Sequence, residues 1–232
     1  MLIGSGLIAQ AFRHLTQIHS GVCVYAAGVS NSLCSDDTEF LRERVRLSDA
    51  LLEANQLDTF VYFGTCSVTD PDAIYTPYVQ HKLAMEKLVS AHPRYLILRL
   101  PQVAGVTPNP HTLLNYLFAK IIRSESFALW NNAKRNIIDV KDVVAITEHL
   151  ISNRSMLNVS LNVANPQNYT MVNIVSVMEQ VVGKQAIYHA VERGTDYTID
   201  VSAIAPLLTA CSVSFGQGYL EQVIGEYYGK QQ

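Results

Sequence analysis

The chain has 232 residues, of which 49% are hydrophobic and 16% charged, and its net charge is −3 at pH 7. This composition is typical of one folded globular unit and excludes a disordered or collagen-like chain. The 17 lysines and arginines are scattered rather than clustered. Because nothing resembles a basic stripe for a phosphate backbone, we expect no nucleic-acid partner.

The cysteine spacing and the hydropathy pattern indicate whether the chain binds a metal and in which compartment it lies. Cys23, Cys34, Cys66 and Cys211 form no CxxC pair and have no metal-like spacing with histidine, so we expect no metal site. No apolar run reaches the roughly 20 residues of a membrane-spanning helix, and the N-terminus lacks a secretory pattern. The sequence therefore predicts a cytoplasmic protein with reduced thiols and no membrane partner.

Apolar runs rich in β-branched and aromatic residues alternate with amphipathic segments of helix length. This alternation predicts a parallel sheet covered by helices on both faces. The predicted strands are residues 1–3, 22–26, 59–63, 95–98 and 161–163. The predicted helices are residues 7–18, 38–54, 78–91, 112–123, 140–152 and 171–182. Asp36 and Glu39 mark the start of the second helix, and Gly183 is suited to end the last one.

The first candidate site lies between the first strand and the first helix, in Gly4-Ser5-Gly6-Leu7-Ile8-Ala9. Glycine lets a backbone turn tightly and approach a pyrophosphate, and the start of a helix offers N–H donors to that anion. The alternative is a plain glycine-rich turn with no ligand.

The second candidate is Tyr78-Val79-Gln80-His81-Lys82, at the start of a predicted helix. A spacing of four places the phenol and the ammonium on one helix face, where the cation can lower the pKa of the tyrosine. Such a tyrosine can act as a general acid or base. The alternative is a solvated surface pair, and we assign structural roles to the seven histidines, including His81.

Hydroxyl groups follow the strand 59–63, in Phe63-Gly64-Thr65-Cys66-Ser67. Ligands of open parallel sheets sit beyond the carboxyl ends of the strands, so a hydroxyl there can bond a substrate oxygen beside Tyr78. The alternative is that Thr65 and Ser67 only close a turn.

Together these segments resemble the extended short-chain dehydrogenase/reductase family, in particular its NAD-dependent epimerase/dehydratase branch, which acts on nucleotide sugars. Val24-Tyr25-Ala26-Ala27-Gly28 resembles the family's strand end beside the cofactor. The segment 98–105 is similar to the stretch that passes the nicotinamide. The segment 135–143 is similar to one whose arginine contacts the substrate diphosphate, although Asn136 and Asp139 depart from it.

The resemblance implies an α/β, Rossmann-like, doubly wound fold in one compact unit. Residues 1–105 would form the shortened dinucleotide-binding part with the Tyr/Lys helix, and residues 106–232 would complete the sheet and form the substrate lobe. It also implies a nucleotide-sugar substrate, NAD or NADP as cofactor, and a homodimer formed through helices 38–54 and 78–91. The implied catalytic residues are Thr65, Tyr78 and Lys82. The implied cofactor-binding residues are Gly4, Ser5, Gly6, Leu7, Ile8, Ala26, Ala27, Gly28, Tyr78, Lys82 and Pro101. The implied substrate-binding residues are Ser67, Gln102 and Arg135.

The chain departs from the family pattern in its first half. Only residues 7–25 lie between Gly6 and Ala26, so two strand–helix units are missing, and with them the residue that distinguishes NAD from NADP. Ile3 and Ala9 stand where the family has the first and third glycines of the loop. We therefore expect weak discrimination between NAD and NADP. The alternative function is a catalytically weak or inactive dinucleotide-binding or regulatory protein of the same fold.

Overall fold

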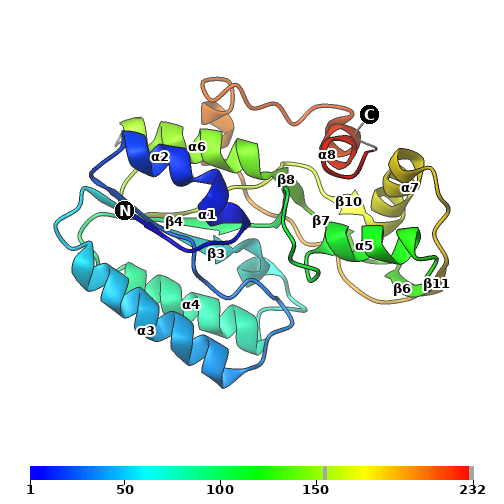
Figure 1. The fold of residues 1–232 in the computed structure, drawn as a ribbon, viewed down its shortest axis with the longest axis horizontal. Helices are drawn as coiled ribbons and strands as arrows, with labels where there is room; N and C mark the ends of the chain where they lie inside the picture. The colour runs from blue at the N-terminus through cyan, green and yellow to red at the C-terminus, as the bar shows by residue number, and fades with distance from the viewer. Residues whose placement is uncertain (154–155, 230–232) are drawn as a thin grey trace.

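A computed structural model describes residues 1–153 and 156–229. Its central sheet has five strands, all parallel, as the sequence predicted (Figure 1). The strands, in their order across the sheet, are β1 (Leu2–Ile3), β2 (Val22–Tyr25), β3 (Thr59–Thr65), β4 (Tyr95–Leu100) and β9 (Val159–Asn162). The predicted α/β class and Rossmann-like parallel sheet are confirmed.

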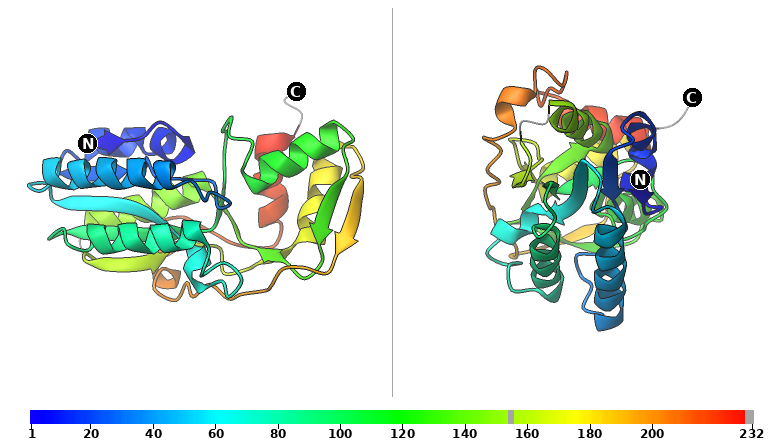
Figure 2. Two further views of the ribbon diagram at one scale, coloured as in Figure 1. Left: turned by 90° about the horizontal axis from the view of Figure 1, so that it is seen from below. Right: turned by 90° about the vertical axis from the view of Figure 1, so that its left-hand side faces the viewer.

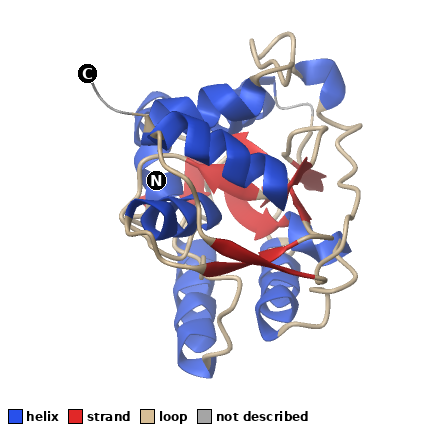
Figure 3. Cartoon of the chain, turned by 90° about the vertical axis from the view of Figure 1, so that its right-hand side faces the viewer, coloured by secondary structure: helices blue, strands red, loops and turns tan. Residues whose placement is uncertain are grey.

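Helices cover both faces of this sheet (Figures 1 and 3). One face packs against α1 (Leu7–Ala11), α2 (Arg13–Ile18) and α6 (Val140–Asn153), and the other against α3 (Asp37–Glu53) and α4 (Pro77–Val89). In β2, Val22 and Val24 face the first group, whereas Cys23 and Tyr25 face the second. Both faces of β2 are buried, which is why its sequence is continuously apolar.

Local capping explains where several helices begin and end. The Asp36 carboxylate accepts the Thr38 N–H at 2.8 Å and starts α3, and Gly183 ends α7 (Met171–Val182) with φ of +70°. Thr76 caps α4, and Pro77 occupies its first turn. The predicted helix 7–18 is divided at Phe12, whose buried ring packs 5.1 Å from that of Phe63.

The first two strand connections have opposite handedness. The connection from β1 to β2 runs through α1 and α2 on one face of the sheet, and the connection from β2 to β3 runs through α3 on the other face. Both connections lead to the next strand in the same direction across the sheet. Nearly all connections between parallel strands are right-handed. The connection through α4 lies on the same face as the one through α3, so these two are right-handed and the connection from β1 to β2 is left-handed. A left-handed step with β1 at the sheet edge is what remains if two strand–helix units beyond β1 are removed.

A second layered part lies beside the sheet and has its own hydrophobic core (Figure 2), whereas Ile204 and Val213 pack in the core of the sheet. It contains α5 (Leu113–Ile122), α7 and α8 (Tyr219–Tyr228). Short strand pairs complete it: β5 (Gln102–Ala104) with β8 (Ile137–Asp139), β6 (Phe127–Trp130) with β11 (Tyr188–Val191), and β7 (Lys134–Arg135) with β10 (Tyr169–Thr170). The sequence analysis missed these strands and α8. Two to four residues carry no readable period, and their pairing partners lie far along the chain.

Two short 3₁₀ helices, η1 (Cys66–Thr69) and η2 (Ala205–Leu207), complete the elements of the described ranges. None of the helices there is long and apolar enough to cross a bilayer.

Candidate active site

A cavity of about 450 Å³ opens at the carboxyl ends of β1 to β4. Both parts of the molecule contribute to its walls, since η1 and α4 line it from one side and β5, β7 and the loop before α5 from the other. All the residues that the sequence assigned to catalysis, cofactor binding and substrate binding line this cavity. Residues spread from position 4 to position 135 are thus brought together at one place.

The two glycines of the first loop have different roles. Gly4 has φ of +131°, and a Cβ there would lie 2.3 Å from the Ala26 carbonyl oxygen, so the packing of the loop against Ala26 requires glycine. Gly6 precedes α1, and an added Cβ at this position would meet no protein atom within 4 Å. Gly4 therefore serves the fold, whereas Gly6 leaves space on the cavity wall.

Thr65 lies beside the phenol of Tyr78. Thr65 ends β3, its hydroxyl accepts the Ser67 N–H at 3.2 Å, and its side chain interacts with the Tyr78 phenol. The Ser67 side chain instead interacts with the Tyr197 phenol. Of the two candidate hydroxyls, Thr65 is the one in contact with the tyrosine.

Lys82 is buried and donates to two protein groups. Its Nζ donates to Oε1 of Glu43 at 3.1 Å and to the Tyr62 hydroxyl at 3.2 Å, and lies 6.0 Å from the centre of the Tyr78 ring. A Cβ on Gly28 would come within 2.5 Å of this Nζ. The ammonium therefore lies directly under the loop that follows β2, and glycine at position 28 makes that approach possible.

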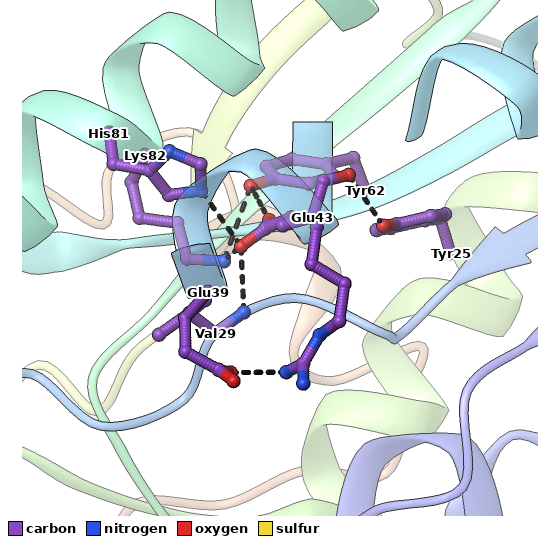
Figure 4. A network of polar contacts seen from close by, with 8 residues as sticks. Tyr25, Val29, Glu39, Glu43, Tyr62, His81 and Lys82 are labelled. Atoms are coloured by element: carbon purple, nitrogen blue, oxygen red, sulfur yellow. Dashed lines mark hydrogen bonds and ion pairs between the residues drawn. The ribbon is translucent and has the colours of Figure 1, made fainter. Parts of the chain in front are cut away.

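The carboxylate of Glu43 is the centre of this network (Figure 4). Besides Lys82, its Oε1 accepts the Tyr62 hydroxyl at 2.9 Å. Its Oε2 accepts the Val29 N–H at 2.7 Å and lies 2.9 Å from His81 Nε2. The side chain is 1% exposed, so these four partners replace the water that a carboxylate would otherwise bind.

Burial and the Glu43 charge set the pKa values of the site. Desolvation lowers the pKa of Lys82, and the neighbouring Glu43 charge opposes this shift. Desolvation raises the pKa of Tyr78, the Glu43 charge raises it further, and the Thr65 hydrogen bond lowers it. The prediction that Lys82 lowers the pKa of Tyr78 is therefore wrong for this structure. The positive charge of Lys82 is compensated by the carboxylate that it binds.

The sequence analysis missed Glu43 and Tyr62 and gave His81 no role at the site. One signal was present in the sequence: Glu43 stands on the same stripe of its helix as the buried Leu47 and Ala50. A charged residue at i, with apolar residues at i+4 and i+7, interrupts an otherwise buried face. Such a carboxylate needs a partner from another element.

The predicted substrate end combines Gln102 of β5 and Arg135 of β7, which line the same cavity as Tyr78. The guanidinium of Arg135 donates to the Lys134 carbonyl at 2.8 Å. Asn136, one of the departures from the family pattern, donates to the Asn165 carbonyl at 2.6 Å and to Asn168 at 3.0 Å. Its amide therefore serves to link strand β8 to the segment before β10.

The other departure and the outer wall of the cavity have structural explanations too. Asp139 accepts the Tyr227 hydroxyl at 2.7 Å, which ties α8 to β8. Arg42 and Arg46 of α3 also line the cavity. Arg42 is paired with Glu39.

Within residues 1–153 and 156–229, no group of three or more His, Cys, Asp or Glu side chains is arranged to hold a metal ion.

The model of the family described as "NAD dependent epimerase/dehydratase family" matches residues 8–164. A search of curated proteins found no match.

Solved structures with this fold include several epimerases and dehydratases. A UDP-glucuronic acid 4-epimerase from Bacillus cereus, in complex with UDP-glucuronic acid and NAD, aligns with a TM-score of 0.72 and 19% identity, over 92% of this chain and 76% of that one. A UDP-galactose 4-epimerase aligns with a TM-score of 0.72 and 18% identity, over 90% and 78% of the two chains. A dTDP-glucose 4,6-dehydratase from Bacillus anthracis, in complex with NAD, aligns with a TM-score of 0.69 and 14% identity, over 94% of this chain and 74% of that one.

Proposed function

The chain belongs to the NAD dependent epimerase/dehydratase family, and from this premise we propose that it is an enzyme that epimerises, dehydrates or reduces the sugar of a nucleotide sugar. The proposal includes NAD or NADP as the cofactor, bound in the cavity at the carboxyl ends of β1 to β4, and a cytoplasmic location. The family description names NAD, and neighbours of the same fold were solved with NAD and with UDP-sugars.

The cavity has the features that a dinucleotide requires. The segment from Gly4 to Ile8 would hold the pyrophosphate, since Gly6 leaves the backbone uncovered there. Ala26, Ala27 and Gly28 would line the cofactor from the end of β2, and Pro101 from the end of β4. When bound, the nicotinamide supplies the acceptor or donor of a hydride.

The chain's own residues would hold the sugar and move its proton. The Tyr78 phenol would exchange a proton with the reacting sugar hydroxyl, and the Thr65 hydroxyl, which lies beside that phenol, would bind the same oxygen. The Lys82 ammonium, which lines the cavity, would donate to the nicotinamide ribose. Ser67, Gln102 and Arg135 would contact the substrate, with Arg135 near its diphosphate.

The single observation that carries this proposal is the contact of Thr65 with Tyr78, one helical turn before Lys82, in the cavity that also contains the glycine loop. A surface Tyr/Lys pair would be solvated, whereas Tyr78 and Lys82 are 8% and 3% exposed. The burial of Tyr78 and Lys82 supports a functional site rather than a chance occurrence of the motif.

We also propose a homodimer formed through α3 and α4. The outer side of α3 exposes Leu41, Val45 and Leu52, at 60%, 53% and 78%, and covering apolar side chains favours association. Light scattering at micromolar concentration should give twice the mass of one 25.7 kDa chain. A mass equal to one chain would contradict the dimer.

The proposed activity is tested with a panel of UDP- and dTDP-linked hexoses, incubated with the protein and NAD or NADP. Products are identified by NMR, and hydride transfer is followed through the absorbance of the reduced nicotinamide. We expect turnover of at least one sugar. If dinucleotide binds and no sugar of the panel is converted, the result favours the binding or regulatory protein over the enzyme.

A further inference from the structure

We propose that Glu43 is a positioning residue of the site: its buried carboxylate holds the Lys82 ammonium at the cavity wall and ties it to the loop that follows β2 (Figure 4). The inference rests on the proposed function for the identity of the ligand that Lys82 meets. Glu43 does not itself line the cavity, whereas Lys82 and Gly28 do. Glu43 therefore acts through Lys82 and the loop.

The contacts of Glu43 join four elements at one point. The carboxylate, on α3, accepts the backbone N–H of Val29, one residue after the predicted cofactor-lining segment. It also accepts the hydroxyl of Tyr62 on β3 and binds Lys82 on α4. A displacement of the carboxylate would move both the loop and the ammonium. The geometry thus couples the wall that would hold the dinucleotide to the side chain that would hold its ribose.

The ion pair also explains how Lys82 can remain charged while buried. An ammonium taken out of water tends to lose its proton unless an opposite charge lies close. Burial raises the pKa of Glu43, but the His81 hydrogen bond, the Lys82 charge and the Val29 N–H outweigh it and lower the pKa to about 2. The carboxylate is therefore ionised near neutral pH, and it supplies the charge that Lys82 needs.

Other groups around Lys82 do not replace Glu43. The titratable and charged groups that face this region come from every element packed around it: Tyr25 on β2, Arg42, Glu43 and Arg46 on α3, Tyr62 on β3, His81, Tyr78 and Glu86 on α4, and Arg99 on β4. Among the acids, Glu86 is bound to Arg99, with three N–O distances of 2.7 to 3.2 Å. Glu43 alone of these acids contacts Lys82 directly.

The test removes the charge and keeps the shape, with Glu43→Gln, and uses Glu53→Gln as a control, because Glu53 is an exposed carboxylate on the same helix. The pKa of Lys82 is measured by NMR with isotope-labelled lysine, and the Lys82 signal is assigned with Lys82→Met. We expect the pKa of Lys82 to fall by on the order of one unit or more in Glu43→Gln and to stay unchanged in Glu53→Gln.

Dinucleotide affinity across the neutral and alkaline range gives the second readout. In Glu43→Gln the dinucleotide affinity should weaken at least about tenfold as the pH rises and Lys82 loses its proton. In the parent and in Glu53→Gln the affinity should not change over the same pH range. Glu43→Asp, which restores the charge, should also restore the flat profile. A role in folding alone would lower stability without creating this pH dependence.

An unchanged pKa of Lys82 in folded Glu43→Gln would overturn the inference. If Glu43→Gln does not fold, the reciprocal measurement decides: in Lys82→Met the pKa of Glu43 should rise from about 2, and no rise would equally overturn it. If the parent binds no dinucleotide, the proposed function fails, and the NMR titration still decides whether Glu43 holds Lys82 in its charged form.

Discussion

The two ends of the cavity are built in different ways. At the end near α4, Tyr78, Lys82 and Glu43 are buried, and four elements are joined through one carboxylate. At the other end, the glycine loop connects an edge strand of two residues to a helix of five, with open space beside Gly6. The difference shows how unevenly the cavity is supported: the end that would carry out the chemistry is held by several buried contacts, and the end that would bind adenosine rests on the short edge strand β1. Substitutions at the two ends should therefore fail in different ways.

The largest effect is expected at the buried end, on turnover. Tyr78→Phe removes one oxygen and keeps the packing of the ring, so the protein should fold and bind dinucleotide. Turnover should fall by about 10²–10⁴-fold, the usual contribution of a general acid or base. Steady-state assays with the sugar found in the panel measure the loss. Turnover equal to that of the parent would remove Tyr78 from the chemistry.

The same end should dominate stability. Glu43→Ala leaves the Lys82 ammonium buried without its partner, and breaking a buried pair in this way costs about 3–5 kcal/mol in the free energy of unfolding. Glu39→Ala, which removes an exposed partner of Arg42 one turn earlier, should cost about 1 kcal/mol or less. Urea unfolding measures both. Equal losses would show that the buried pair has no special role.

Acid should weaken the buried end through the same carboxylate. The pKa of Glu43 is lowered from an ordinary value of 4.5 to about 2 in the folded protein, so its contribution is complete above pH 4.5 and is lost as the pH falls toward 2. The contribution is about 3 kcal/mol. Urea unfolding at a series of acid pH values should therefore show a steeper loss in the parent than in Glu43→Gln. Parallel curves would contradict the lowered pKa.

At the open end, binding should change while the fold is kept. In Gly6→Val the added carbons meet no protein atom at Cβ and extend toward the proposed pyrophosphate position. The dinucleotide affinity should weaken at least about tenfold, or 1.4 kcal/mol, with an unchanged thermal midpoint. Calorimetry and thermal unfolding measure the two quantities. Unchanged binding in the folded variant would exclude the loop from the site.

The smallest effect expected is the difference between the two cofactors. The missing strands would have carried the residue that reads the adenosine ribose, and Arg42 and Arg46 are the charged groups on that wall. We expect the affinities for NAD and NADP to differ by less than about a hundredfold, or 2.7 kcal/mol. A larger preference, measured by calorimetry, would show that another segment replaces the lost strands.

Sequence patterns predicted much of the fold because the long elements repeat locally. The strand and helix that carry Thr65 and Tyr78 have clear periods and hydroxyl, phenol and ammonium groups at readable spacings. The short strands β5 to β8 depend on partners far along the chain and leave no such pattern. The same holds at the site, where Lys82 lies 39 residues from Glu43.

The wrong pKa direction for Tyr78 has the same physical origin. The sequence shows that Tyr78 and Lys82 share a helix face, and so predicts an attraction between them. It does not show that burial raises the pKa of the tyrosine, or that a carboxylate from α3 binds Lys82 and raises that pKa further. Contacts between side chains of one helix can be predicted from their spacing in the sequence. Contacts with a charged side chain of another element can be predicted only when the fold is known.

We expect residues 1–105 to bind a dinucleotide in the cavity beside Tyr78 and Lys82. A crystal structure of the protein with NAD would test this binding. We predict that the pyrophosphate lies over residues 4–8 and that the nicotinamide ribose lies within hydrogen-bonding distance of Lys82 Nζ. Crystals grown with saturating NAD whose cavity holds no dinucleotide, or in which the nicotinamide lies away from Tyr78, would contradict it.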